Sequence, residues 1–411
     1  MSAPEVLART TLADRIRAVF VPPTTAEAGV PLAGRDARLD MFRGLALVMI
    51  FINHVPGNFY EAYTSRNYGF SDAAEAFVFM SGMAAGLAYS NGFRNGPLWP
   101  AIARVWARAR QLYFVHLSIT FVALGIFAAA ALWLGATELL SRNNLGPIFA
   151  HPLEAMVGIP LLTHQLGYLN ILPLYATLLL ATPLLIPIGL RWPLATLVGS
   201  VLVWMLAGQF RLNFPNFPTP GGWFFNPLSW QLLFVVGLLC GMAMKAGQRF
   251  VPRNPLLFSF LAAFLVFILF WVKIPALGDA GREGLGALSK LGLPFYITWF
   301  DKTFVALPRL AHALALFYVL AYLAPVRWFA STKLAAPLRL LGKHGLAIFA
   351  TGTVLSLALQ AVRMDMEPDP LADGLMLGAG LILLWALAWA LSATAKARAN
   401  TQAARAAATA A

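Results

Sequence analysis

The sequence has little charge and almost no cysteine. Only 11% of its 411 residues are Asp, Glu, Lys or Arg, whereas about 25% is usual in a soluble domain. Hydrophobic residues make up 59%, so the chain lacks the polar surface that two or three soluble domains of this total length would need. These values exclude a soluble globular protein, a disordered chain and a fibrous repeat. They predict an integral membrane protein.

Other absences exclude further classes. The single cysteine, Cys240, lies in an apolar run, which argues against a disulfide framework and against a cysteine-based zinc or iron–sulfur site. The sequence contains no GxxxxGK[ST], HExxH or GxSxG motif, which argues against an ATP-driven pump, a zinc protease and a standard serine hydrolase. No set of ligands suggests a bound metal, so we expect none.

Long apolar windows are abundant instead. Ten windows of about 20 residues are apolar enough to cross a hydrocarbon core. They lie at 40–56, 72–91, 110–137, 167–189, 193–209, 228–246, 255–273, 307–325, 343–362 and 371–394. They predict an all-α polytopic membrane protein with about ten transmembrane helices and with membrane lipids around it. Residues 35–395 form this domain. Residues 1–34 are expected to be a cytoplasmic segment, either an interfacial helix or disordered, and 396–411 a disordered cytoplasmic tail.

The distribution of charge indicates the topology. If the N-terminus is cytoplasmic and ten spans alternate, most of the 30 Lys and Arg residues fall on the cytoplasmic side, as the positive-inside rule requires. Every Asp and Glu after residue 60 then falls at or beyond the outer side. We therefore expect both termini in the cytoplasm and a multi-pass location in a bacterial inner membrane. The net charge of +13 reflects this bias, and no nucleic-acid partner is expected. The sequence leaves the oligomeric state open.

The first span carries three ionisable residues on one predicted helix face. Arg43 is three residues from Asp40, close enough to pair, and His54 follows Arg43 by about three helical turns. The rise per residue places His54 about 21 Å from Asp40, toward the outer side. Ionisable groups within a span usually face the protein interior and mark function. The alternative is that His54 is only a satisfied residue near a span end.

The second span begins with Asp72 and Glu75, which share a helix face. A carboxylate near His54 could fix its tautomer and stabilise its charged form. Alternatively, both acids are there because the helix dipole favours negative charge at an N-terminus. Further along, Gly82 and Gly86 are four residues apart, a spacing that suits close helix packing.

Two outer segments combine aromatic side chains with amides and hydroxyls. They lie at 210–230 and 295–302, and their candidate sugar-binding residues are Trp223, Asn226, Trp230 and Trp299. An aromatic belt at the membrane interface would explain them as well.

Polar side chains also gather at the start of the eighth span and on the cytoplasmic side. A polar cavity or a solvated helix end would account for the first group, Asp301, Lys302, Arg309 and His312. On the cytoplasmic side, Arg104 and Arg108 could hold phosphates, although the positive-inside bias explains them equally well.

Four stretches together resemble a known family. The run Arg38-x-Asp40-x-x-Arg43-Gly-x-Ala46 followed by His54 resembles the membrane-bound acyltransferase superfamily, and within it the OpgC type. The other stretches are 71–82, 226–237 and 301–312. The resemblance covers about 35 to 390. It implies a fold of about ten helices that transfers an acyl group, succinyl in this type, from cytosolic acyl-CoA to a hydroxyl of a periplasmic glucan. Acetyl-CoA is the alternative donor.

The resemblance also implies residue roles. His54 matches the histidine regarded as catalytic in the superfamily, and Asp40 and Arg43 match its inner motif. We expect His54 to act as general base, or to carry the acyl group as an acyl-histidine, with Asp72 or Glu75 as its partner. Arg38, Arg43 and the basic loops would hold coenzyme A, and Lys302 or Arg309 would meet a succinyl carboxylate.

A proton-coupled transporter of a small polar or anionic solute is the competing hypothesis, because intramembrane Asp, Arg and His residues also occur in carriers. The absence of repeat symmetry between the two halves argues against it.

Overall fold

The chain forms helices joined by loops. The computed structural model describes residues 36–364 and 366–410. In these residues the extended pairing is limited to one isolated bridge between Pro215 and Gly222, so the predicted all-α fold is confirmed for this part of the chain. The interpretation of residues 1–34 lies outside the described residues.

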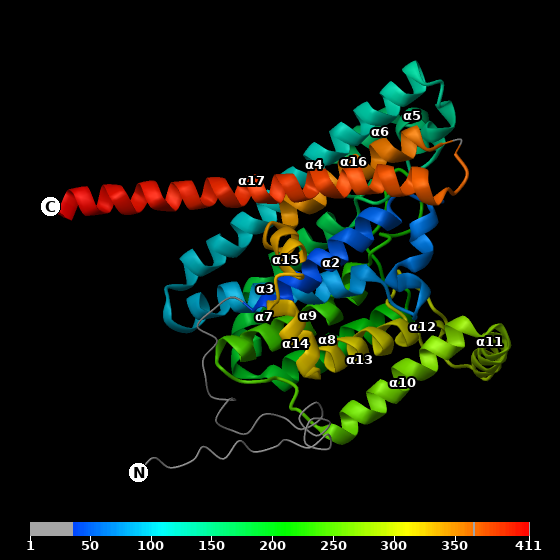
Figure 1. The fold of residues 1–411 in the computed structure, drawn as a ribbon. Coiled ribbons are helices and arrows are strands. Elements are labelled where there is room, and N and C mark those ends of the chain that lie inside the picture. Colours follow the sequence, from blue (N-terminus) through cyan, green and yellow to red (C-terminus); the bar gives the residue numbers. More distant parts are fainter. Residues whose placement is uncertain (1–35, 365, 411) are drawn as a thin grey trace, which may run out of the picture.

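Each predicted apolar window coincides with one helix (Figure 1). These ten helices are α2 (Ala37–Asn53), α3 (Ala73–Asn95), α4 (Leu98–Trp133), α7 (Ile171–Arg191), α8 (Pro193–Gln209), α9 (Pro227–Lys245), α10 (Pro255–Lys273), α13 (Leu307–Tyr322), α16 (Gly345–Val362) and α17 (Pro370–Ala410). Short helices connect them: η1 (Phe59–Tyr63), η2 (Ser65–Asn67), η3 (Thr137–Ser141), α5 (Gly146–Ala150), α6 (Pro152–Gly158), α11 (Pro275–Lys290), α12 (Phe295–Thr298), α14 (Ala324–Ser331) and α15 (Ala336–Lys343).

Six helices among the described residues are long and apolar enough to cross a membrane: α4, α7, α9, α10, α16 and α17. A seventh span results if α13 and α14, which meet at an angle of 72°, are counted as one. The protein is therefore a multi-pass membrane protein. α2, α3 and α8 are too short or too polar to meet the same criteria, so ten spans and cytoplasmic termini stay predictions.

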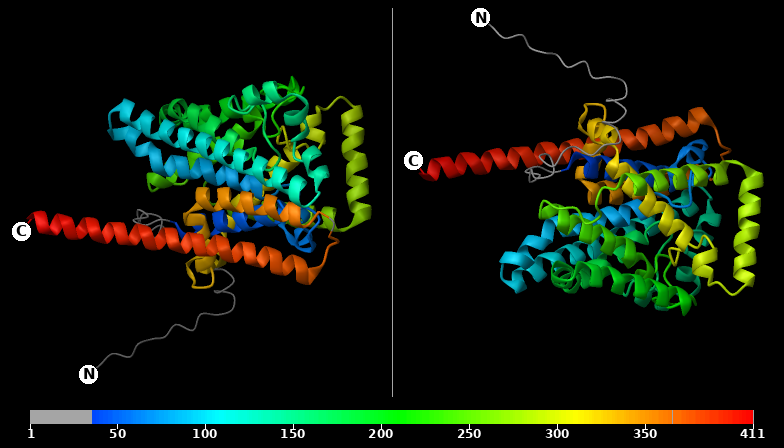
Figure 2. Two further views of the ribbon diagram at one scale, coloured as in Figure 1. Left: turned by 90° about the horizontal axis from the view of Figure 1, so that it is seen from above. Right: turned by 90° about the horizontal axis from the view of Figure 1, so that it is seen from below.

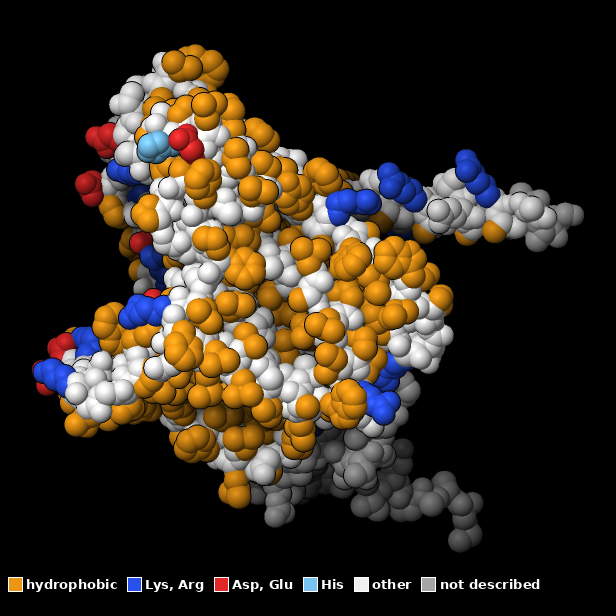
Figure 3. Space-filling model, turned by 180° about the vertical axis from the view of Figure 1, so that it is seen from behind, with side chains coloured by type: hydrophobic (Ala, Val, Ile, Leu, Met, Phe, Trp, Pro, Cys, Tyr) orange, Lys and Arg blue, Asp and Glu red, His pale blue; other side chains and the backbone are white. Residues whose placement is uncertain are grey.

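The molecular surface fits this location. The face shown in Figure 3 is covered largely by apolar side chains. Acidic and basic side chains are mixed at one margin of this face, whereas the charged side chains seen at the opposite margin are Lys and Arg. This segregation is the pattern expected of an inner-membrane protein with a basic cytoplasmic side.

The C-terminal segment differs from the expectation. Residues 396–410, predicted to be disordered, continue α17 as a helix to Ala410, which projects beyond the rest of the molecule (Figures 1 and 2). The physical reason is composition, because Ala, Arg, Gln and Lys have high helix propensities. An alanine-rich segment of this kind was expected to be disordered, although its residues favour a helix.

α3 lies at the centre of the bundle, in contact with α2, α4, α7 and α9. Its contact with α9 depends on glycine. A Cβ atom at Gly82 would overlap the carbonyl oxygen of Phe234, and one at Gly237 would overlap that of Phe79. The two backbones therefore meet without intervening side chains, as in other small-residue helix contacts. The structural interpretation of Gly82 is confirmed, and this contact fixes the position of every α3 side chain.

The close contact predicts a sharp cost for one methyl group. Gly82→Ala should destabilise the protein by about 1–3 kcal/mol, because the added Cβ must push two backbones apart. Thermal unfolding in detergent would measure this. Gly125→Ala in α4 is the matched control, since a Cβ there meets nothing within 4 Å. Equal melting temperatures for the two variants would contradict the proposed contact.

Candidate functional site

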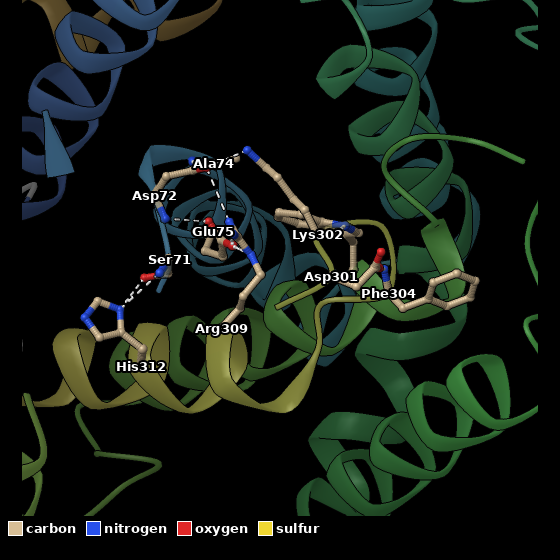
Figure 4. Close-up of polar contacts among 10 residues, drawn as sticks. Ser71, Asp72, Ala74, Glu75, Asp301, Lys302, Phe304, Arg309 and His312 are labelled. Atoms are coloured by element: carbon tan, nitrogen blue, oxygen red, sulfur yellow. Dashed lines mark hydrogen bonds and ion pairs between the residues drawn. The ribbon is translucent and has the colours of Figure 1, made fainter. Parts of the chain in front are cut away.

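Two acids and two cations form one cluster at the start of α3 (Figure 4). Lys302 Nζ lies 2.5 Å from Asp72 Oδ2. Arg309 donates to Glu75 Oε1 through Nε at 2.8 Å and through Nη2 at 2.5 Å, and its Nη2 lies 3.3 Å from Asp72 Oδ2. The cluster joins the start of α3 to the first turn of α13 and to the loop before it, although the two acids and the two cations are more than 220 residues apart in sequence.

The local sequence fixes the orientation of both acids. Asp72 is the N-cap of α3 and accepts the backbone N–H of Ala74 at 2.8 Å, while Glu75 Oε2 accepts the backbone N–H of Asp72 at 2.9 Å. This is a capping box, which satisfies two N–H groups of the helix end. Each acid therefore has one side committed to the helix and the other available to a cation.

Burial makes the pairing necessary. The side chain of Glu75 is 0% exposed and that of Arg309 is 12% exposed. A buried charge without a partner costs several kcal/mol, so the four groups neutralise one another. The hydrogen bonds of Asp72 and Glu75 thus go to Lys302, Arg309 and the helix backbone, and not to His54 as the sequence analysis expected.

The loop before α13 is held by neighbouring aromatic residues. Trp230 Nε1 donates to the carbonyl oxygen of Lys302 at 3.0 Å, and Asp301 Oδ1 accepts the backbone N–H of Phe304 at 2.7 Å. His312 Nδ1 shares a hydrogen bond of 2.7 Å with Ser71 Oγ. The structure therefore brings Lys302 and His312 to the start of α3, through Asp72 and Ser71, whereas the hydrogen bond of Asp301 lies within its own loop.

His54 lies at the C-terminal end of α2 and close to this cluster. The charges of Lys302 and Asp72 act on it electrostatically. Its backbone carbonyl accepts Gln360 Nε2 at 2.6 Å, and its ring packs against Tyr168 with 4.7 Å between ring centroids. Its Nδ1 is buried and has no hydrogen-bond partner among the described residues. A buried polar atom without a partner is rare and calls for an explanation, of which a catalytic role is one.

A second feature is a cavity of about 200 Å³ between α2, α3, α4, α7, α15 and α16. Its wall includes three cations, Arg43, Arg108 and Lys343, and the hydroxyl-bearing Tyr89 and Tyr175. The other residues of its wall are apolar or small: Phe77, Ser81, Ala84, Ala85, Ala88, Leu112, Leu172, Gly342, Gly345, Leu346 and Phe349.

The cavity follows α3. The α3 residues in its wall run from Tyr89 to Phe77, a distance along the helix axis of about 18 Å. Phe77 follows Glu75 by two residues and therefore points to a different face of α3. The cavity thus reaches the level of the ionic cluster along the helix, but none of the four cluster residues lines it. Small side chains at Ala84, Ala85 and Ala88 leave the space open along this wall.

The structure separates the predicted donor-binding residues into two groups. Arg43 and Arg108 line the cavity, and Asp40 lies beside it through its ion pair with Arg43 at 3.5 Å. Arg104 is exposed and donates to the carbonyl oxygen of Ala88 at 3.3 Å.

Arg38 points elsewhere and binds Asp36 at 2.8 Å. Although burial alone would raise it, the hydrogen bond and the charge of Arg38 hold the pKa of Asp36 below its ordinary value. Arg38 thus serves the start of α2, and it does not line the cavity.

Sequence reasoning missed Lys343, Tyr89 and Tyr175. Lys343 was used only as one of the charges that indicate the topology. Its position at the beginning of the ninth apolar window, on the same predicted side as the inner end of the first window, could have indicated a shared site. Nothing in the local sequence distinguishes the two tyrosines from other membrane aromatics.

The predicted sugar-binding aromatics are mostly inside the protein. Trp230 and Asn226 are 0% exposed, and Trp223 is 5% exposed. Asn226 caps α9 by accepting the backbone N–H of Leu228 at 3.0 Å. Trp299, by contrast, is 57% exposed. The first three side chains therefore pack or cap in this conformation, and only Trp299 presents its ring at the surface.

The ionic cluster generates a stability prediction. Arg309→Met should destabilise the protein by about 3–5 kcal/mol, because it leaves a buried carboxylate without its cation. Arg309→Met combined with Glu75→Gln should recover part of that loss, since the second change removes the unpaired charge. Thermal unfolding of both variants would test this. A double variant that is less stable than the single one would show that the pairing is not the source of the effect.

Comparison with known proteins places the chain in a family. The family model described as OpgC protein matches residues 35–396, which include α2, the ionic cluster and the cavity. No curated protein and no solved structure is significantly similar to the chain. Because the match covers most of the sequence, the protein belongs to the OpgC family.

Proposed function

We propose that the protein transfers an acyl group from cytosolic acyl-CoA to a hydroxyl of a periplasmic glucan. Membership of the OpgC family supports acyltransferase-type modification of such glucans. The observation that carries the proposal is the cavity along α3. It is basic at one end, follows about 18 Å of α3, and is lined by small residues along this helix.

The chemistry of the cavity fits a coenzyme A thioester. Arg43, Arg108 and Lys343 offer charge-assisted hydrogen bonds to phosphates. An extended pantetheine arm is comparable in length with the α3 wall. With the phosphates at the basic end, the thioester would lie near Phe77, in the second turn of α3. The proposed reaction requires that it reach His54 from there.

His54 is the proposed general base. Its imidazole removes the proton of a glucan hydroxyl while the oxygen attacks the thioester carbonyl carbon. The carbon–sulfur bond then breaks, the coenzyme A thiolate leaves, and the imidazolium returns the proton to it. The products are the glucan ester and free coenzyme A. In the alternative course His54 first accepts the acyl group and the hydroxyl then attacks the acyl-histidine.

Lys302 and Arg309, the two candidate partners of a succinyl carboxylate, differ in their burial and in their ion pairs. Arg309 is almost buried and bound to two carboxylates, whereas Lys302 is 28% exposed and bound to Asp72. Lys302 is therefore the group that we assign to a succinyl carboxylate. Acetyl-CoA is the alternative donor and would need no such partner.

Transfer across a sealed membrane tests the proposed reaction. Proteoliposomes with labelled succinyl-CoA or acetyl-CoA on one side and a glucan on the other should accumulate labelled glucan. His54→Ala should abolish this without changing thermal stability. Absence of label on the glucan with both donors, from well-folded protein, would contradict the proposal. Transport of a solute by the same vesicles would then favour the carrier hypothesis.

The cavity predicts which arginine matters for the donor. Arg108→Gln should raise the KM for acyl-CoA about tenfold, because one charged hydrogen bond to a phosphate is lost. Arg110→Gln is the matched control, since Arg110 is exposed on the same helix and does not line the cavity. Initial rates at varied acyl-CoA concentration would measure both. An equal KM for the two variants would place the donor elsewhere.

A further inference from the structure

Tyr168 is held in an unusual conformation beside His54. Its φ of 68° lies in the left-handed region, which is unfavourable for a bulky residue. It belongs to the loop between α6 and α7, where Gly167 precedes it. A backbone of this kind persists only when its surroundings enforce it, and such positions cluster at functional sites.

The ring is placed against the proposed catalytic group. The Tyr168 and His54 rings are 4.7 Å apart at 51°. Tyr168 is only partly buried, so part of its side chain stays accessible. The charges of Arg66 and Glu61, which pair at 3.1 Å, also act on it. Tyr168 thus lies between His54 and a polar segment, residues 59–67. The predicted topology puts this segment on the outer side, where the acceptor is expected.

A chain of hydrogen bonds sets this placement. The backbone N–H of Gly167 donates to the carbonyl oxygen of Asn143 at 2.8 Å. Asn143 Nδ2 donates to Gln360 Oε1 at 2.8 Å, and Gln360 Nε2 donates to the carbonyl oxygen of His54 at 2.6 Å. The loop that carries Tyr168 and the helix end that carries His54 are therefore connected through Asn143 and Gln360. Their relative position is part of the fold.

We propose that Tyr168 is the wall of the acceptor subsite, on which a pyranosyl unit of the glucan stacks while its hydroxyl meets His54. This inference rests on the proposed function. A sugar ring has an apolar C–H face that a flat aromatic ring can cover, and hydroxyl groups at its edge that point to polar partners. Tyr168 offers the aromatic face, and His54 lies at van der Waals distance from it. The tryptophans at positions 223 and 230 are buried and cannot do this.

Glucan binding without a donor tests the subsite. Binding of a defined glucan oligosaccharide to the purified protein would be measured by calorimetry for wild type, Tyr168→Leu, Tyr168→Ala and Tyr168→Phe. The Leu and Ala variants should bind about tenfold or more weakly, as expected when an aromatic contact at a binding centre is removed. The Phe variant, which keeps the ring, should stay within about threefold of wild type. Leucine preserves apolar packing if alanine perturbs the fold.

Tyr63→Ala is the matched control. Tyr63 lies in η1, is 62% exposed, and should leave glucan binding unchanged. The Leu and Phe variants should have equal melting temperatures in detergent, so that a lower affinity of the Leu variant alone reports the loss of the ring. Unchanged glucan affinity in the Leu and Ala variants would overturn the inference.

The two proposals fail differently. If Tyr168 variants weaken glucan binding but no acyl transfer occurs in proteoliposomes, the subsite stands and the proposed reaction is wrong. If transfer occurs and binding is independent of Tyr168, the reaction stands and the subsite is wrong.

Discussion

The contact between the backbones of α3 and α9 determines where the functional groups lie. α3 carries Asp72 and Glu75 at one end and forms a wall of the cavity along its length. Because Gly82 and Gly237 allow the two helices to touch directly, α3 has no freedom to slide or rotate. The ionic cluster, the cavity and their separation from His54 all follow from that fixed axis.

The charges are arranged differently at the two ends of this axis. At the start of α3, two acids and two cations compensate one another. At the other end, Arg43, Arg108 and Lys343 gather around one cavity, with Asp40 paired to Arg43. A polyanion is attracted to the basic end, while the neutral end neither repels nor retains it. This asymmetry suits a reaction in which a charged donor and an uncharged sugar approach from opposite sides.

The periodicity of the sequence was sufficient to predict the helices and the contacts within a helix. The apolar windows matched ten helices, and the spacing of Asp40 and Arg43 predicted their ion pair. Local reasoning failed where the partner is distant in sequence. It offered Asp72 or Glu75 as the partner of His54, and it could not show that both acids bind Arg309 of α13 or that Asp72 also binds Lys302 in the preceding loop. Nor could it show that Gln360 and Tyr168 contact His54. It chose Trp230 for a sugar because composition does not show which aromatic residues are buried.

The capping box gives Asp72 and Glu75 two roles at once. Each acid both starts a helix and balances a cation, so a change at either position alters folding and charge together. Lys302 is different, because its contact with Trp230 uses the backbone carbonyl and its side chain binds Asp72 without taking part in the capping box. A substitution at this lysine would therefore change the charge balance of the cluster without removing a hydrogen bond from the helix end.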